Sequence, residues 1–271
     1  MSDAALPSHP DAASALDELD GLLSSNSEDD LVQYAIATHS VYLCSEDTLR
    51  RASELAEKRK GRLHIHVSET RKEIADCHAK TGLYPVEYLD SIDFFQPGTV
   101  CAHASWVKKN EIRIMKHHEA TAVHCPSSNM KLACGGTLSY RGAGVDVRLG
   151  TDGAASSGNG LNMQAEARLA ALVQRHDHWD PTLLPAVDAM DLATKGSRDW
   201  AVWDLDDVRM RPQGRANNRH LANLIFNGAD CVDLWVNGTA LRRNGTTLTI
   251  DEHAVLDEID EAVATYYEGV E

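Results

Sequence analysis

Three short apolar segments each end in a residue that can bind a metal or move a proton. The run at residues 145–149 stops at Gly150-Thr151-Asp152-Gly153, which places a carboxylate between glycines. Two earlier runs end in His66 and in His103. Imidazole and carboxylate groups bind zinc and iron, and they are also common general acids and bases. The sequence therefore predicts a metal site or an acid–base site built from strand ends.

The elements that must position these residues alternate between strand-like and helix-like patterns from residue 31 onward. This alternation predicts βα units with a parallel sheet, in which all carboxyl ends lie at one edge. Barrels and open α/β folds keep their chemistry at that edge. The predicted strands lie at residues 31–37, 63–67, 99–102, 121–125 and 145–149.

The segments outside these units divide the chain into three predicted parts. Residues 1–30 are expected to be disordered or briefly helical, with disorder over 1–13 and a helix over 14–23 capped by Ser14. Residues 31–196 are expected to form a partial barrel, in which 126–132 form a loop and 138–143 a helix. In residues 197–271, the predicted turns at Asn237-Gly238 and Asn244-Gly245 indicate a small antiparallel β element before a final helix that starts at Asp251.

Charge and composition exclude several classes of protein. The net charge is −15, from 41 acidic against 26 basic residues, which argues against nucleic-acid binding because phosphates need a basic face. Arginine outnumbers lysine, and the acidic excess suits a high-salt cytoplasm. Neither a membrane span nor a secretory leader is evident, so a cytoplasmic protein is expected. The six cysteines form no Cys-x-x-Cys pair and are expected to be buried free thiols.

Five motifs, taken in order, resemble the amidohydrolase superfamily. The resemblance is to its branch of S-adenosylhomocysteine and methylthioadenosine deaminases, guanine deaminases and triazine chlorohydrolases, and it covers residue 31 to the end. The motifs are Ala37-Thr38-His39-Ser40, His64-Ile65-His66-Val67-Ser68-Glu69-Thr70, Ala102-His103, His124-Cys125-Pro126-Ser127-Ser128-Asn129-Met130-Lys131 and Leu149-Gly150-Thr151-Asp152-Gly153.

The resemblance implies a (β/α)₈ barrel beside a small β-sandwich, with one divalent metal that is usually zinc and sometimes iron. By matching positions, His66 is implied to be a metal ligand. Asp152 is implied to bind the metal and to take a proton from its water, which His103 orients or polarises. Glu69 is implied to protonate a purine ring nitrogen, and His39 to contact the substrate.

Two further positions have more than one interpretation. Asn129 lies in a loop that either shapes the substrate pocket or simply caps a surface turn. His64 and His66 are two residues apart and can share one strand face, so the pair alone could bind a metal. The resemblance assigns the metal to His66 only and places His64 within the barrel wall. Zinc deaminases of the Pro-Cys-x-x-Cys type are excluded because that cysteine pair is absent.

The chemistry implied by the resemblance is hydrolytic deamination of a purine nucleoside-type small molecule. A metal makes hydroxide available near neutral pH, and the hydroxide attacks the carbon that bears the exocyclic amine. Glu69 neutralises the charge that builds on the ring, and Asp152 delivers a proton toward the leaving ammonia. S-adenosylhomocysteine and methylthioadenosine are the expected substrates, with guanine and triazines as alternatives.

The chain departs from the family at its beginning and near residue 195. No His-x-His motif precedes residue 31, so two metal ligands and the first three barrel strands are expected to be missing. His66 and Asp152 alone are too few ligands for tight zinc binding. Three hypotheses follow. The first is a deaminase whose missing ligands come from another chain or from a part of the protein outside the given sequence. The second is an inactive truncated relative, and the third is a part-barrel that assembles with itself or a full-length relative.

Overall fold

The computed structural model describes residues 10–27, 31–135, 142–154, 157, 160–213 and 219–268. Contacts within the chain divide it into two compact units, Met1–Lys195 and Gly196–Glu271. Every helix in the described ranges is too short or too polar to pass through a lipid bilayer.

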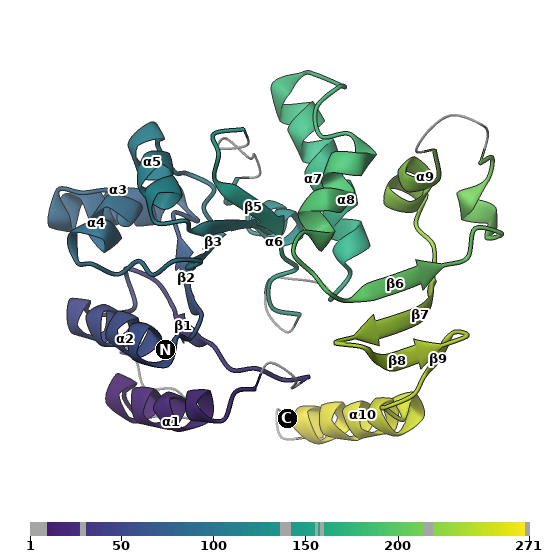
Figure 1. Cartoon of the computed structure of the whole chain (residues 1–271), viewed down its shortest axis with the longest axis horizontal. Coiled ribbons are helices and arrows are strands. Elements are labelled where there is room, and N and C mark those ends of the chain that lie inside the picture. Colours follow the sequence, from purple (N-terminus) through teal and green to yellow (C-terminus); the bar gives the residue numbers. More distant parts are fainter. Residues whose placement is uncertain are drawn as a thin grey trace. The chain divides into compact units, whose positions relative to one another are not determined.

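The first unit is built on a five-stranded sheet in which each strand runs parallel to its neighbours (Figure 1). The strands follow one another in chain order, so each pairs with the next. This confirms the predicted α/β class and its five βα units, and among the described residues the sheet does not close into a barrel. The strands are β1 (Ile36–Thr38), β2 (Leu63–Val67), β3 (Val100–His103), β4 (Thr121–His124) and β5 (Asp146–Leu149).

Helices follow every strand of this sheet and provide the connections that parallel strands need. They leave all five carboxyl ends at the same edge of the sheet, as the sequence predicts. The helices are α2 (Glu46–Arg59) after β1, α3 (Arg71–Thr81) and α4 (Pro85–Ser91) after β2, α5 (Lys109–His117) after β3, α6 (Pro126–Lys131) after β4, and α7 (Met163–His178) and α8 (Ala186–Thr194) after β5.

Strand β2 shows how the sequence pattern places the site. Leu63, Ile65 and Val67 are each no more than 1% exposed, whereas His64 and His66 are less buried on the opposite face. This alternation follows from the two-residue period of a strand. The two histidine rings lie 5.3 Å apart, so they share one face as predicted.

The core of the first unit lies between the sheet and its helices. Each apolar side chain buried there contributes about 1.5–3 kcal/mol to the free energy of unfolding. The largest fully buried side chains of this unit are Ile36, Leu49, Leu63, Ile65, Leu89, Phe94, Met115 and Leu184, with the histidine His103 among them.

The N-terminal helix α1 (Ala12–Ser24) begins earlier than the sequence predicts. Asp11, not Ser14, is its N-cap, and the Asp11 Oδ1 accepts a hydrogen bond of 2.8 Å from the Ser14 amide. A carboxylate at this position also interacts favourably with the helix dipole. The prediction of disorder is therefore wrong for residues 10–13, and residues 1–9 lie outside the described part of the chain.

The predicted loop at residues 126–132 is wrong, because Pro126–Lys131 forms helix α6. Proline is favoured at the first position of a helix, and Pro126 gives that signal in the sequence. Strand β1 starts at Ile36, five residues later than predicted. The predicted helix at residues 138–143 lies mostly outside the described residues.

The second unit contains a four-stranded antiparallel sheet in the order β6-β7-β8-β9, which confirms the predicted β element. Asn237 and Gly238 both have positive φ in the turn between β7 and β8, as a two-residue hairpin turn needs. The elements are β6 (Trp200–Trp203), a 3₁₀ turn (Val208–Met210), α9 (Arg219–Asn227), β7 (Cys231–Val236), β8 (Thr239–Arg243), β9 (Thr246–Thr247) and α10 (Glu252–Glu268).

An aromatic pair and an amphipathic helix characterise this second unit. Trp200 and Trp235 face each other across β6 and β7 with ring centroids 3.8 Å apart.

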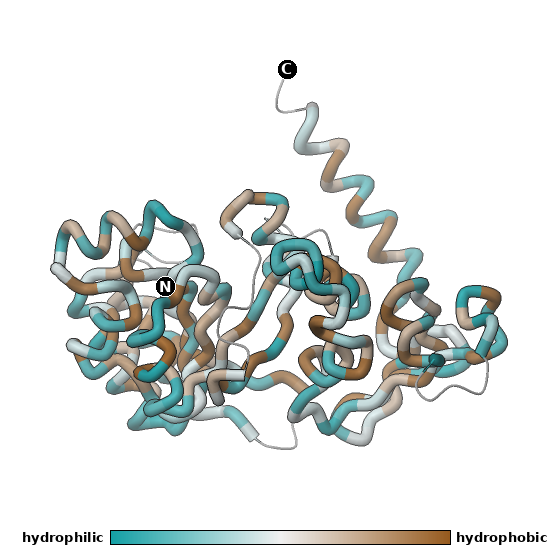
Figure 2. The backbone as a smooth tube through the Cα atoms, turned by 90° about the horizontal axis from the view of Figure 1, so that it is seen from above, coloured by the Kyte–Doolittle hydropathy of each residue, from teal (hydrophilic) through white to brown (hydrophobic). Residues whose placement is uncertain are grey.

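Apolar and polar segments alternate along α10, the final helix in Figure 2, and its apolar side chains are exposed. The exposed set is Val255, Leu256, Ile259, Val263, Tyr266 and Tyr267.

Candidate active site

The residues singled out by the sequence gather at the carboxyl edge of the five-stranded sheet. Parallel strands bring their ends together there, although the residues lie more than 100 positions apart in the chain. Each of the five strands contributes: His39 follows β1, His66 and Glu69 come from β2 and its loop, His103 ends β3, Asn129 lies in α6 after β4, and Asp152 follows β5.

His39 and His66 are linked across β1 and β2. The His66 Nδ1 lies 2.7 Å from the His39 carbonyl oxygen, and the two rings are 5.0 Å apart. A carbonyl oxygen only accepts, so the His66 Nδ1 is the donor and carries the proton. Burial, and then the neighbouring His66, lowers the pKa of His39 and favours its neutral form.

His66 and His103 stack on neighbouring strands, with ring centroids 5.6 Å apart and planes inclined by 25°. His103 is 2% exposed, and its Nε2 lies 3.8 Å from the Glu69 Oε2, whose side chain is 14% exposed. This distance is longer than a hydrogen bond but short enough for a strong electrostatic interaction when the ring is protonated. The structure thus brings the Glu69 carboxyl group close to the His103 ring without a direct hydrogen bond between them.

The loop that carries Glu69 is held by a buried carboxyl group. Glu73, 3% exposed, accepts hydrogen bonds from the Ser68 amide at 2.8 Å and the Glu69 amide at 2.9 Å. Burial raises the pKa of Glu73 to about 7. Sequence analysis missed Glu73, although Thr70-x-x-Glu73 has the spacing of a capping box. Thr70 does cap α3, and Glu73 instead orders the preceding residues.

Asp152 stands in a left-handed backbone conformation (φ 58°) just after β5. Its Oδ2 accepts hydrogen bonds from the hydroxyls of Ser128 at 2.6 Å and Ser157 at 2.7 Å, and its Oδ1 accepts one from the Gly153 amide. Burial by itself raises the pKa of Asp152, but these hydrogen bonds outweigh it and lower the pKa to about 2. The carboxylate is therefore ionised at neutral pH and suits a cation.

Asn129 does not reach the surface, since its exposed fraction is 0%. Its Oδ1 lies 2.8 Å from the His103 Nδ1, and its Nδ2 donates a hydrogen bond of 2.9 Å to the Ser105 Oγ. The surface cap, one of the two interpretations given above, does not fit a buried side chain. A contact between Asn129 and a substrate stays a prediction.

Two other histidines on these strands lack a hydrogen-bond partner at one buried nitrogen, His64 at Nδ1 and His124 at Nε2. Burial, and then the charge of His66, lowers the pKa of His64 to about 4. Burial, and then His103, lowers the pKa of His124 to about 3. Both rings are therefore neutral over the physiological pH range. Such low pKa values suit a buried packing role and do not suit a general acid or base.

The donor set fits a metal site only in part. His66 donates its Nδ1 proton to a backbone carbonyl, which is the usual arrangement of a histidine that binds metal through Nε2. Asp152 supplies an ionised carboxylate. Across the described ranges, however, no three His, Cys, Asp or Glu side chains come close enough together to bind a metal. The described residues alone therefore do not complete a metal centre.

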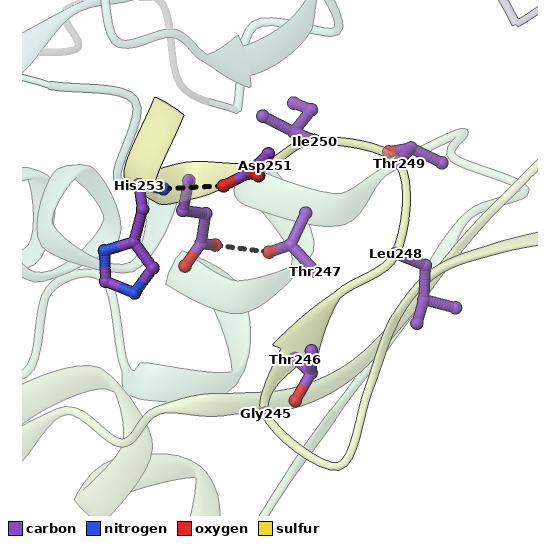
Figure 3. A pocket seen from close by; sticks show the side chains of 9 residues that line it. Gly245, Thr246, Thr247, Leu248, Thr249, Ile250, Asp251 and His253 are labelled. Atoms are coloured by element: carbon purple, nitrogen blue, oxygen red, sulfur yellow. Dashed lines mark hydrogen bonds between the residues drawn. The ribbon is translucent and has the colours of Figure 1, made fainter. Parts of the chain in front are cut away.

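A separate hollow lies in the second unit and has a different character. It is lined by the continuous stretch from Gly245 to His253 (Figure 3). Within it Thr247 is hydrogen-bonded to Glu252, and the His253 amide donates to the Asp251 Oδ1 at 3.1 Å. These bonds fix the start of α10. None of the strand-end residues lines this hollow, so it is not the candidate active site.

Comparison with known proteins assigns the chain to a class. The model of the amidohydrolase family matches residues 12–198, which is more than half of the chain. The chain belongs to the amidohydrolase family, as its motifs predict.

Individual relatives are named as deaminases. The chain is 37% identical over 257 residues to the 5'-deoxyadenosine deaminase of Methanothermobacter thermautotrophicus, with 89% of this chain and 60% of the relative covered. It is 34% identical over 245 residues to the 5-methylthioadenosine/S-adenosylhomocysteine deaminase of Pyrococcus furiosus, with 84% and 58% covered. The chain thus spans about 60% of the length of these relatives.

Solved structures share the fold at lower sequence identity. A zinc-bound adenosine deaminase from Xanthomonas campestris matches with a TM-score of 0.87 at 24% identity, covering 96% of this chain and 63% of that one. A guanine deaminase from C. acetobutylicum with bound guanine matches with a TM-score of 0.74 at 21% identity, covering 88% and 63%. These likenesses establish the architecture of the chain.

Proposed function

We propose that this chain carries the acid–base half of a metal-dependent site that hydrolytically deaminates a purine nucleoside-type substrate. The observation that carries the proposal is the approach of Glu69 to the buried His103, 3.8 Å apart, at the sheet edge that also holds His66 and Asp152. The names of the similar deaminases give 5'-deoxyadenosine, methylthioadenosine and S-adenosylhomocysteine as their substrates, which supports this substrate class.

Each residue receives a role from its surroundings. His66, with its Nδ1 proton donated to the His39 carbonyl, offers Nε2 to a divalent metal. Asp152 offers an ionised carboxylate to the same metal. When bound, such a metal supplies a water molecule of lowered pKa. Glu69 holds a proton for the heterocycle, and His39, partly buried beside His66, contacts the substrate.

Zinc is the metal we propose, because imidazole and carboxylate are ligands that it accepts readily. Iron has the same ligand preferences and is the alternative. The remaining ligands must come from outside the described residues, since two donors fall short of the three that a catalytic zinc site usually has. A second chain is one source of such ligands, so assembly belongs to the proposal.

Metal content tests the proposed ligands directly. The chain is purified in molar salt, and zinc and iron per chain are measured by mass spectrometry. We expect near-stoichiometric metal that is lost in both His66→Ala and Asp152→Ala. His64→Ala is the matched control, because His64 lies on the same face of β2 only two residues away and should leave the metal in place. Metal that is absent, or retained in the Asp152 variant, would contradict the assignment.

Ammonia release tests the reaction. The metal-loaded chain is assayed with 5'-deoxyadenosine, methylthioadenosine and S-adenosylhomocysteine, with Glu69→Gln alongside. We expect the Glu69 variant to lose about 100-fold or more in kcat, since a positioned general acid contributes about 10²–10⁴-fold. Equal activity of the variant and the parent would remove Glu69 from the mechanism.

A second candidate function is assembly without catalysis. Within the described sheet, β1 and β5 each pair with only one strand, which leaves two edges that can pair with another chain. A stable dimer that contains no metal and releases no ammonia would favour this function over the deaminase. Size measurement by light scattering on the same preparation distinguishes the two.

A further inference from the structure

The backbone at the end of β3 is strained where His103 stands. His103 has φ 67° and Ala104 has φ 47°, both in the left-handed region that non-glycine residues avoid. Such conformations cost of order 1–3 kcal/mol each and persist only where the surrounding structure enforces them. The Ala104 amide donates to the Val67 carbonyl at 3.0 Å, which ties this turn to β2. The His103 ring is therefore held on a strained turn of the backbone.

The ring itself is held from the next strand along the sheet. Asn129 reaches it from helix α6, which begins directly after β4. The backbone of Asn129 is fixed as well. Its backbone N–H donates to the Cys125 carbonyl, and its backbone carbonyl accepts from the Cys134 N–H, both at 2.9 Å. Its side chain is fully buried between His103 and Ser105.

The direction of these hydrogen bonds determines where the His103 proton lies. The Asn129 Nδ2 donates to the Ser105 Oγ, and the amide oxygen Oδ1 lies on the side of His103. An amide oxygen only accepts, so the His103 Nδ1 must donate. In the neutral ring Nε2 then carries the lone pair, and Nε2 is the atom that faces the Glu69 carboxyl group.

We propose that Asn129 is a positioning residue that locks His103 in its Nδ1-protonated tautomer and so presents the Nε2 lone pair to the reaction site. The inference deepens the proposed function, and its consequence for catalysis rests on that function. It places His103 in the same tautomer as His66, whose Nδ1 donates to the His39 carbonyl. Two stacked imidazoles thus offer Nε2 lone pairs from neighbouring strands.

Nitrogen NMR of the full chain tests the tautomer without any assay of activity. With ¹⁵N-labelled histidine, two-bond correlations distinguish a protonated Nδ1 from a protonated Nε2, and His103→Gln identifies the signals of His103 by their loss. We expect Nδ1–H in the parent at neutral pH. Asn129→Asp keeps an acceptor toward the ring and should retain that tautomer, whereas Asn129→Leu removes the acceptor and should populate Nε2–H.

His66 serves as the internal reference in the same spectra, because its own acceptor is the His39 backbone and is untouched by changes at Asn129. A parent spectrum with Nε2–H at His103 overturns the proposal, even if the variants fail to fold. An unchanged tautomer in a folded Asn129→Leu variant overturns it as well.

If the chain deaminates, the same variants give a second readout. We expect Asn129→Leu to lower kcat about 10–100-fold with little change in KM, as is usual for partners that orient a site residue, and Asn129→Asp to restore most of it. A general loss of structure would not be rescued in this way. If no variant and no parent releases ammonia, the proposed function fails while the NMR result still decides the tautomer.

Discussion

Buried histidines with lowered pKa values make this protein sensitive to acid. The rings of His64 and His124 are neutral in the folded chain, with pKa values of about 4 and about 3. An unfolded chain titrates its histidines near the ordinary pKa of about 6.5. Below that pH the unfolded state binds protons that the folded state does not, so the free energy of unfolding decreases as the pH falls.

We therefore predict that His124→Gln flattens this acid dependence. Between pH 6.5 and pH 4, unfolding of the parent takes up about one proton at His124, and the variant lacks this uptake. The slope of the free energy of unfolding against pH should therefore be smaller in the variant by about 1.4 kcal/mol per pH unit. Denaturant melts at several pH values measure the slope. His117→Gln is the control, because His117 is exposed and should leave the slope unchanged. A parent whose stability does not fall toward pH 4 would contradict the pKa assignments.

The residues that could be predicted from sequence are those whose position follows from strand periodicity. His66 and His103 lie at the ends of their strands and Asp152 follows β5, so their meeting at one edge follows from parallel pairing alone. Asn129 could not be placed in the same way, because its role depends on a short helix after β4 and on the direction of one side chain. The burial of Glu73 was equally hidden, since the Thr70-x-x-Glu73 spacing indicates a helix cap and not an inward-facing carboxyl group.

At the scale of elements, three buried glutamates fasten loops to helices. Glu73 holds the loop after β2, Glu111 accepts from the Val86 amide at 2.9 Å at the start of α4, and Glu166 accepts from the Ser127 amide at 3.0 Å at the start of α6. Each is less than 5% exposed. Helices α3 and α7 thus hold backbone amides close to the candidate site, and α5 holds the first turn of α4.

We predict that Glu166→Gln destabilises the chain by about 1–3 kcal/mol, because the Ser127 hydroxyl and amide both use the Glu166 carboxylate and an amide side chain provides only one oxygen. Denaturant unfolding measures the change. Asp177→Asn removes the same charge from an exposed position on the same helix and should change stability by less than about 0.5 kcal/mol. Equal effects of the two variants would argue against a role for the buried contact.

The predictions failed at some element boundaries and at one element type. Strand β1 is only three residues long, and α6 forms where a loop was expected. The apolar residues before Ile36 resemble a strand in composition, yet none of them from residue 31 onward joins the sheet. Pairing partners, not composition, determine where a strand starts, and a single sequence does not display its partners.

At the scale of the whole molecule, the chain carries a net charge of −15. Like charges repel one another within a compact chain, and salt screens that repulsion over a distance of about 8–10 Å at 0.10–0.15 M and about 3 Å at 1 M. A chain adapted to high salt should therefore become more stable as the salt concentration rises, over a range in which the stability of ordinary proteins changes little.

We predict that the thermal midpoint rises as KCl increases from 0.1 M to 2 M. Calorimetry measures the midpoint, and NaCl at the same ionic strength separates screening from a specific effect of potassium. A parallel series in sucrose at matched water activity controls for general exclusion of cosolutes. A midpoint that is flat or falls with salt would remove the halophilic interpretation.

The sequential order of the five strands also bears on how the chain is made. Each strand after β1 pairs with the strand synthesised just before it, so from β2 onward a partner strand has already left the ribosome when the new strand emerges. Contacts between neighbours in sequence form with a small loss of chain entropy. Such a sheet can grow one βα unit at a time during translation, and every intermediate presents a single growing edge.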